Sequence, residues 1–224
     1  APDESTGAVA PPLHLSTTFR HGPAGERVAG YEYQREGNPT NDRLRESLAA
    51  LEGGQAACTF ASGMAAMSTL LDCLPNGARV LFPDDCYSGL RMLFQEFLPE
   101  RGIVAEVVDM ADLEAVRAAC ATPVAMLWIE TPSNPLMKIS DIASLAGIGH
   151  AAGAIVVVDN TFATPLLQRP LALGADIAMH STTKYFGGHS DVLGGALVFA
   201  KDDELARKVA HRLHVTGAVL SPFN

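Results

Sequence analysis

Along most of the chain, short apolar runs alternate with stretches whose apolar residues recur at helical spacing. About seven of the runs are apolar almost throughout, which is typical of strands covered on both faces of a mainly parallel sheet. We predict these strands at AACTF, ARVLF, IVAEVV, PVAMLWIE, AIVVVD, DIAMH and GALVFA. The stretches between them predict helices on both faces of the sheet, so the expected fold class is α/β.

Helix boundary signals support this alternation. Asn38-Pro39-Thr40 opens the first predicted helix, and Gly53-Gly54 ends it. Further helices are predicted at SGMAAMSTLLDCL, SGLRMLFQEFL, residues 112–120, residues 141–152 and DDELARKVAHRL. Residues 1–40 are rich in Pro, Gly and charge and show no sustained period. We therefore predict an extended N-terminal arm over 1–40, which packs on something else, and one domain over 41–224.

Composition narrows the class of protein. With 48% apolar residues, the 224-residue chain can bury a sizeable core. A net charge of −9 without a basic block argues against nucleic acid and anionic membranes as partners. The four cysteines are widely spaced and form no CxxC pair, which favours reduced thiols and a cytoplasmic location. We find no pattern of a secretory signal, a membrane span or a metal site.

Two charged residues follow predicted strands, at the edge where open parallel sheets place their ligands. Asp159 ends AIVVVD, and Lys184 follows DIAMH in the polar bridge HSTTKYFGGHSD. A capping aspartate and a surface lysine are the ordinary interpretations of each residue alone. Burial, however, makes a lysine amine a better nucleophile and suits it to Schiff-base chemistry. Taken alone, Lys184 therefore leaves both interpretations open, and the neighbouring strand ends have to decide between them.

Three further segments belong to the same predicted edge. Ser62-Gly63-Met64 stands where a strand becomes a helix, and free N–H groups at such a helix start favour a phosphate. Tyr87 follows ARVLF and offers an aromatic face, and Asn134 lies in a Pro-bracketed loop after PVAMLWIE. Alone, these are consistent with packing at a helix start, a half-buried tyrosine and a turn. Together with an acid and an amine they match pyridoxal 5′-phosphate, whose aldehyde requires a lysine and whose ring nitrogen requires a carboxylate.

The chain also resembles a known family. YEYQREGNPT, ASGMAA, DDCY, ETPSNP, VVVDNTFATP and HSTTKYFGGHSDVLGG are similar to signatures of the Cys/Met-metabolism pyridoxal-phosphate enzymes. The resemblance runs from TGAVAPP to TGAVLSPF, practically the whole chain. It implies the large domain of a fold-type I PLP-dependent transferase. Such a domain has a mainly parallel seven-stranded sheet with helices on both faces, preceded by an extended N-terminal arm.

The resemblance implies a role for each residue at the sheet edge. Lys184 would hold the cofactor as a Schiff base and move protons, and Asp159 would pair with the ring nitrogen. Tyr87 would stack on the ring and assist proton transfer. Asn134 would lie near the cofactor O3′ and the substrate carboxylate. The expected phosphate ligands are Ser62, Gly63, Met64, Ser181 and Thr183.

For the arm, the resemblance implies a partner. Tyr33 and Arg35 would reach the phosphate of a neighbouring subunit, so we expect a homo-oligomer with shared sites, a dimer that pairs into a tetramer. Gln34 replaces the usual serine between them. The family's arginine for the substrate carboxylate lies in a smaller C-terminal domain that this sequence lacks. Because the chain also starts without Met, we expect residues to be missing at both ends.

Two residues bear on the reaction. In cystathionine γ-synthases and γ-lyases the arm position of Glu32 is typically acidic, and the resemblance implies that Glu32 faces the second ammonium group of the substrate beside Tyr33. Gly89 stands where methionine γ-lyases carry a cysteine. The pattern of the β-lyases differs from GNPT and ETPSNP. We therefore expect chemistry at Cγ, first γ-elimination of cystathionine to cysteine, 2-oxobutyrate and ammonia. The alternatives are γ-replacement on an acylhomoserine by cysteine, O-acetylhomoserine sulfhydrylation, methionine γ-elimination, and a non-catalytic cofactor-binding protein.

Overall fold

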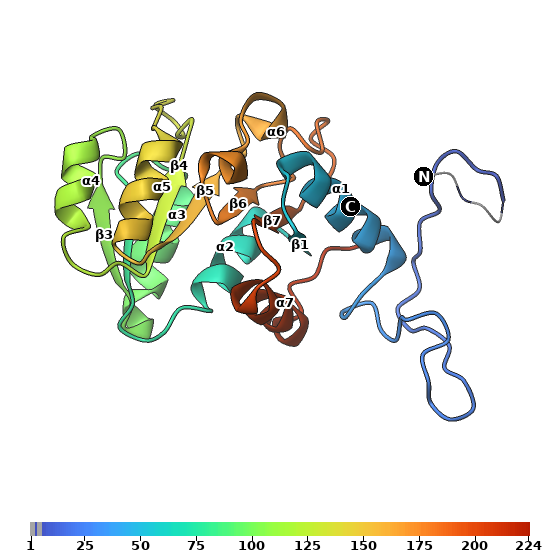
Figure 1. The fold of residues 1–224 in the computed structure, drawn as a ribbon. Helices are drawn as coiled ribbons and strands as arrows, with labels where there is room; N and C mark the ends of the chain where they lie inside the picture. The colour runs from blue at the N-terminus through green and yellow to red at the C-terminus, as the bar shows by residue number, and fades with distance from the viewer. Residues whose placement is uncertain (1–2, 4–5) are drawn as a thin grey trace.

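The structure is a computed structural model that describes residue 3 and residues 6–224. A seven-stranded sheet crosses the molecule and is flanked by helices (Figure 1). The strands are β1 (Ala56–Phe60), β2 (Arg79–Pro83), β3 (Val104–Val108), β4 (Met126–Glu130), β5 (Ile155–Asp159), β6 (Ile177–His180) and β7 (Gly195–Phe199). The helices are α1 (Pro39–Glu52), α2 (Gly63–Leu71), α3 (Ser88–Met92), α4 (Leu113–Ala119), α5 (Ile142–Ala151), α6 (Thr164–Leu167) and α7 (Glu204–Thr216).

The sheet has the order β1-β7-β6-β5-β4-β2-β3. β7 pairs antiparallel with β1 and β6, and the remaining pairs are parallel. β1 to β6 therefore end at one edge of the sheet. β7 begins at the same edge, because Gly195 pairs with Phe60 of β1. The predicted mainly parallel seven-stranded sheet is confirmed.

Alternation along the strands separates two cores on opposite faces. Trp128 and Val157 lie in the larger core, under α2, α3 and α7. Leu127 and Val156 lie in the core on the other face, under α4 and α5. α1 covers β7 and the end of β6 through Leu48, which packs with Ala178 and Val198. The prediction of helices on both faces is therefore also confirmed.

Local signals set the helix boundaries. The Asn38 side chain accepts a hydrogen bond from the Thr40 N–H at the start of α1, and Gly53 ends that helix with a φ of 77°. The stretch predicted as one helix over 88–98 changes from α3 into a π-helical segment at Leu93–Phe97. α6 and the 3₁₀ turn Pro170–Leu173 were not predicted, because both are too short to show a period.

Residues 6–38 form no helix or strand. Two isolated bridges, Thr18 with Tyr33 and His21 with Arg27, are the ladder contacts in this segment. In Figure 1 the segment, in blue, lies beyond α1 and away from the centre of the sheet. Its contact with a neighbouring subunit stays a prediction.

The four cysteines are free, as predicted. Burial raises the pKa of the Cys58 thiol to about 11 and that of Cys86 to about 12, so both are thiols at neutral pH. Among the described residues, no helix has the length and apolar character needed to cross a membrane.

Candidate active site

A cavity of about 150 Å³ lies at the edge where β1 to β6 end. Loops that follow β1, β2, β4, β5 and β6 all contribute to its walls. The cavity is lined by Ser62, Gly63, Met64, Met67, Tyr87, Glu130, Pro132, Asn134, Asp159, Thr161, Phe162, Ser181, Thr183, Lys184 and Leu193. The sheet thus brings together nine residues that the sequence nominated, from Ser62 to Lys184.

Asp159 is the acid at the end of β5 and is 5% exposed. Its Oδ1 accepts hydrogen bonds from the Thr161 N–H (3.0 Å) and the Thr161 hydroxyl (2.5 Å). Burial raises the pKa of Asp159, whereas the Thr161 donors and His180 act in the opposite direction. A buried carboxylate of this kind is matched to a cationic N–H, which would compensate its charge.

Lys184 lies on the turn after β6 and lines the cavity, but its side chain is exposed. This exposure is what the ordinary surface-lysine interpretation predicts, and it is the position in the cavity that groups Lys184 with the other predicted residues. The residue sits in the loop beyond the strand, and the buried positions are those within β6 itself. Among the described residues, no ion pair involves Lys184, so its amine is not tied to a carboxylate.

The start of α2 forms one wall of the cavity. The Ser62 hydroxyl accepts a hydrogen bond from the Ala65 N–H, while the first N–H groups of any helix have no partner within it. Gly63 lies against Ser181: a Cβ at position 63 would be 3.1 Å from Ser181 Cβ and 3.3 Å from its Oγ. The missing side chain leaves the helix start accessible to an anion.

Thr183, also predicted to bind phosphate, has its hydroxyl engaged by the chain itself. Its Oγ1 donates to the Gly194 carbonyl (3.1 Å) and accepts from the Gly194 N–H (3.0 Å). This exchange fixes the loop carrying Lys184 to the segment that leads into β7. The role of Thr183 as a phosphate ligand stays a prediction, and its observed contact is with Gly194.

Tyr87 occupies the N-cap position of α3, without a side-chain capping hydrogen bond, and is 40% exposed. Its ring occupies the space that a side chain at position 89 would fill, since a Cβ there would be 2.5 Å from Tyr87 Cε1. That Cβ would also be 2.8 Å from Met64 Sδ on the wall formed by α2. Gly89 therefore lets the Tyr87 ring lie close to α2.

Glu130 is a cavity residue that the sequence interpretation missed. It ends β4, is 5% exposed and lies beside Asp159 in the sheet register. Burial and the nearby Asp159 charge raise its pKa to about 8. Its sequence signal equals that of Asp159, an acid at the end of an apolar run. Only Asn134 was predicted from the ETPSNP motif, in which Glu130 is the first residue.

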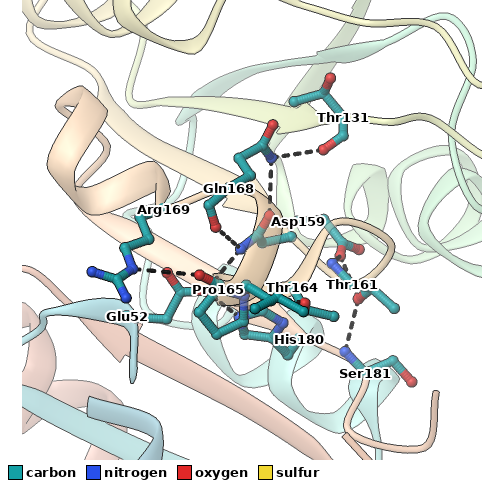
Figure 2. Close-up of polar contacts among 12 residues, drawn as sticks. Glu52, Thr131, Asp159, Thr161, Thr164, Pro165, Gln168, Arg169, His180 and Ser181 are labelled. Carbon is teal, nitrogen blue, oxygen red and sulfur yellow. Dashed lines mark hydrogen bonds and ion pairs between the residues drawn. The ribbon is translucent and has the colours of Figure 1, made fainter. Parts of the chain in front are cut away.

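On the opposite face of the sheet, a buried polar network supports these strand ends (Figure 2). Glu52 of α1 and His180 of β6 are both fully buried, with 2.6 Å between Oε1 and Nε2. Asn160 Nδ2 donates to Glu52 Oε1 (2.8 Å), and Gln168 Nε2 donates to Asn160 Oδ1 and to the Thr131 carbonyl (2.9 Å each). The network thereby links α1 to the ends of β4, β5 and β6.

The same figure shows how β5 is joined to β6 on the side of the cavity. Thr161 Oγ1 donates to Asp159 and accepts from the Ser181 N–H (2.9 Å). One hydroxyl therefore fixes the distance between the buried acid and the predicted phosphate ligand.

The predicted arm residues do not line the cavity. Glu32 pairs with Arg27, which also pairs with Glu36. The Arg35 guanidinium lies 5.3 Å from the centre of the Tyr33 ring and donates to the His214 carbonyl (3.2 Å). Within one chain, these residues therefore belong to a separate surface.

Pyridoxal phosphate can be tested against this geometry. Its phosphate suits the start of α2, where a Cβ at Gly63 would crowd Ser181. Its ring nitrogen suits the buried Asp159, and its aldehyde suits the exposed Lys184 amine in the same cavity. The residues present fit the group.

Comparison with known proteins agrees with this fit. The chain matches, over residues 1–224, the family model described as Cys/Met metabolism PLP-dependent enzyme. It is 45% identical over 223 residues to a probable cystathionine gamma-synthase of Herpetosiphon aurantiacus, covering 100% of this chain and 69% of that protein. It is 43% identical to a cystathionine beta-lyase of Lactococcus lactis subsp. cremoris, covering 98% of this chain and 57% of that protein.

Among solved structures, the fold superimposes on cystathionine gamma-lyase from Lactobacillus plantarum, crystallised with L-serine, with a TM-score of 0.94. The two chains are 39% identical, and the match covers 99% of this chain and 57% of the other. This chain thus spans 57% to 69% of the length of these three proteins.

Proposed function

Because this chain belongs to the Cys/Met metabolism PLP-dependent enzyme family, we propose that it acts at Cγ of a sulfur amino acid or its homoserine precursor, cleaving or forming the Cγ–S bond of cystathionine. The observation that carries the proposal is the meeting of Lys184, Asp159 and the start of α2 in one cavity. Pyridoxal 5′-phosphate, when bound, supplies the electron sink that stabilises negative charge at the substrate carbons.

The chain's own residues divide the remaining work. Asp159, buried and held by Thr161, keeps a proton on the ring nitrogen by offering it a negative partner. The Lys184 amine, exposed in the cavity, holds the cofactor and then moves protons at the substrate carbons. Tyr87 covers the ring and assists proton transfer. The phosphate is bound by Ser62, Gly63, Met64, Ser181 and Thr183.

Two positions favour cystathionine over methionine as the sulfur-containing substrate. Glu32 supplies a carboxylate on the arm for a substrate with a second ammonium group, and its present partner Arg27 is exposed and exchangeable. Gly89 gives Tyr87 its position and lacks the cysteine of the methionine γ-lyases. Asn134, whose N–H is fixed on Glu130, would lie near the substrate carboxylate.

Cleavage and formation of cystathionine are both retained because different relatives favour each. The Lactobacillus plantarum structure is named a gamma-lyase, and the Herpetosiphon aurantiacus relative a probable gamma-synthase. γ-Elimination adds water to cystathionine and releases cysteine, 2-oxobutyrate and ammonia. γ-Replacement joins cysteine to an acylhomoserine and releases the free carboxylic acid.

Product analysis of the full-length protein, loaded with pyridoxal phosphate, tests the proposal. 2-Oxobutyrate and cysteine from cystathionine would support γ-elimination, and cystathionine from acylhomoserine plus cysteine would support γ-replacement. Pyruvate and homocysteine would show Cβ cleavage and contradict the assignment to Cγ. Cofactor binding without turnover of any of these substrates would instead support a non-catalytic binding protein.

We also propose that the working enzyme is a cytoplasmic homo-oligomer, a dimer or a pair of dimers. In it, residues 1–40 would bring Tyr33 and Arg35 to the cavity of a neighbouring subunit. In support, both side chains lie outside the cavity of their own chain and are exposed. An arginine beyond residue 224 would hold the substrate carboxylate. Sedimentation of the full-length protein, with and without residues 1–40, would test the contribution of the arm.

A further inference from the structure

Glu130 makes two backbone contacts that no other acid at the cavity makes. The Tyr87 N–H lies 3.1 Å from its Oε1 and 2.9 Å from its Oε2, and the Asn134 N–H donates to Oε1 at 2.8 Å. One carboxyl group therefore fixes the backbone of Tyr87, after β2, and that of Asn134, after β4.

A second acid joins the same two loops in the opposite sense. Asp85, in the loop after β2, accepts from the Ser133 hydroxyl and from the Leu136 N–H (3.0 Å) in the loop after β4. Asp85 alone would still let the end of its loop move around Tyr87. Glu130 removes that freedom, because it binds at Tyr87 itself.

We propose that Glu130 is a positioning residue for the cofactor, which holds the Tyr87 ring and Asn134 at fixed places in the cavity that Asp159 lines. The inference rests on the proposed binding of pyridoxal phosphate in this cavity. It adds a residue that touches neither the phosphate nor the aldehyde and acts through the two side chains whose backbone it binds.

The electrostatic surroundings of Glu130 are consistent with this role. Burial raises the pKa of Glu130, as do the carboxyl groups of Asp159 and Asp85, whereas the Tyr87 and Asn134 N–H groups act in the opposite direction. A protonated Glu130 still accepts both N–H groups through its carbonyl oxygen.

The test compares Glu130→Ala, Glu130→Gln and the control Glu106→Gln in the full-length protein, with pyridoxal phosphate as the probe. Glu106 is likewise a strand glutamate, but it lies on the outer strand β3, away from the cavity. There it pairs with Arg79 of β2. The measurements are the dissociation constant of the cofactor, the visible circular dichroism of the bound cofactor, and kcat and KM separately.

We expect Glu130→Ala to weaken cofactor binding about tenfold, because the Tyr87 and Asn134 N–H groups lose their acceptor. Its visible circular dichroism should change as the Tyr87 ring shifts. Glu130→Gln keeps one carbonyl acceptor and should lose about threefold or less, mainly in kcat. If Glu130→Ala does not fold, the circular dichroism and kcat of Glu130→Gln decide the case.

Wild-type affinity and circular dichroism in the Glu130 variants would overturn the inference, as would an equal loss in Glu106→Gln. A wild-type protein that does not bind pyridoxal phosphate would refute the proposed function instead. The two failures are therefore distinguishable.

Discussion

The sheet-edge cavity and the N-terminal segment 6–38 both contain residues that the sequence nominated, but the fold treats them differently. At the cavity, nine nominated residues from loops far apart in the sequence line one space, and buried strands fix their positions. In the segment, Glu32 pairs with Arg27. Arg35 lies over the Tyr33 ring and donates to the His214 carbonyl.

The difference shows where a single chain suffices. Parallel strands bring their ends together whatever else surrounds them, so the cavity forms within one subunit. A segment held by two bridges, exposed ion pairs and single hydrogen bonds to α1, such as that of Tyr31 to Asp42, has weak constraints of its own. Its nominated residues need a surface from elsewhere, which is what the proposed neighbouring subunit would supply.

Lys184→Ala should give the largest effect, because it removes the amine on which the cavity depends. Turnover should fall roughly 10²- to 10⁴-fold. Borohydride reduction followed by mass spectrometry should find no covalently retained cofactor. Lys201→Ala, at an exposed lysine beyond β7, is the matched control. Cofactor retained on the Lys184 variant would remove the central residue from the proposed site.

Asp159→Asn should reduce kcat by roughly 10²-fold, since a neutral amide no longer stabilises a cationic ring nitrogen. The cofactor should still attach, so the absorbance of the bound cofactor should be retained while turnover falls. Asp141→Asn is a suitable control because asparagine also caps helices, and Asp141 caps α5. Unchanged turnover would contradict the role given to Asp159.

Glu52→Ala tests whether the strand ends depend on the buried network of the opposite face. It leaves His180 without its partner, and the free energy of unfolding should fall by about 3–5 kcal/mol. Glu46→Ala, at an exposed position of the same helix, should change it by less than about 0.5 kcal/mol. Denaturant unfolding measures both. Similar small changes would show that the cavity edge does not need this pair.

Arg35→Ala tests the N-terminal segment 6–38. It should leave the unfolding free energy almost unchanged, because the side chain is exposed. Cofactor affinity should nevertheless fall about tenfold if the guanidinium reaches a neighbour's phosphate. Equilibrium dialysis against Arg117→Ala, an exposed arginine on α4, measures this. Equal affinities would argue against a shared site.

Glu130→Gln should have the smallest effect on turnover of these variants, and we expect its signature in the pH dependence of stability without cofactor. The folded pKa of Glu130 lies near 8 and the ordinary value is 4.5, so the folded wild type binds the extra proton between them. The contribution of this proton to the free energy of unfolding of the wild type is complete below about pH 4.5 and is lost as pH rises to about 8. The variant lacks this loss, so the difference in Tm, variant minus wild type, should rise steadily across that window. A constant difference would contradict the raised pKa.

Much of the architecture could be predicted from local pattern. The runs from AACTF to GALVFA became the seven strands, and Asn38 and Gly53 bounded α1 as predicted. α6 and the π-helical segment at Leu93–Phe97 were not predicted, because packing, and not periodicity, determines them. At the site, Glu130 escaped because its importance depends on a neighbour in the sheet, Asp159, that lies 29 positions away in the sequence (159 minus 130).

The sequence by itself determined the strand ends and the residue types that follow them, because apolar runs and glycine or proline signals act locally. Only the tertiary structure decided which of those residues meet. Strand alternation turned Asp159 and Glu130 to one face and His180 to the other, where it pairs with Glu52. The strand order put the start of α2 opposite Lys184. Those juxtapositions depend on strand order and register, which are set by packing among segments distant in the chain.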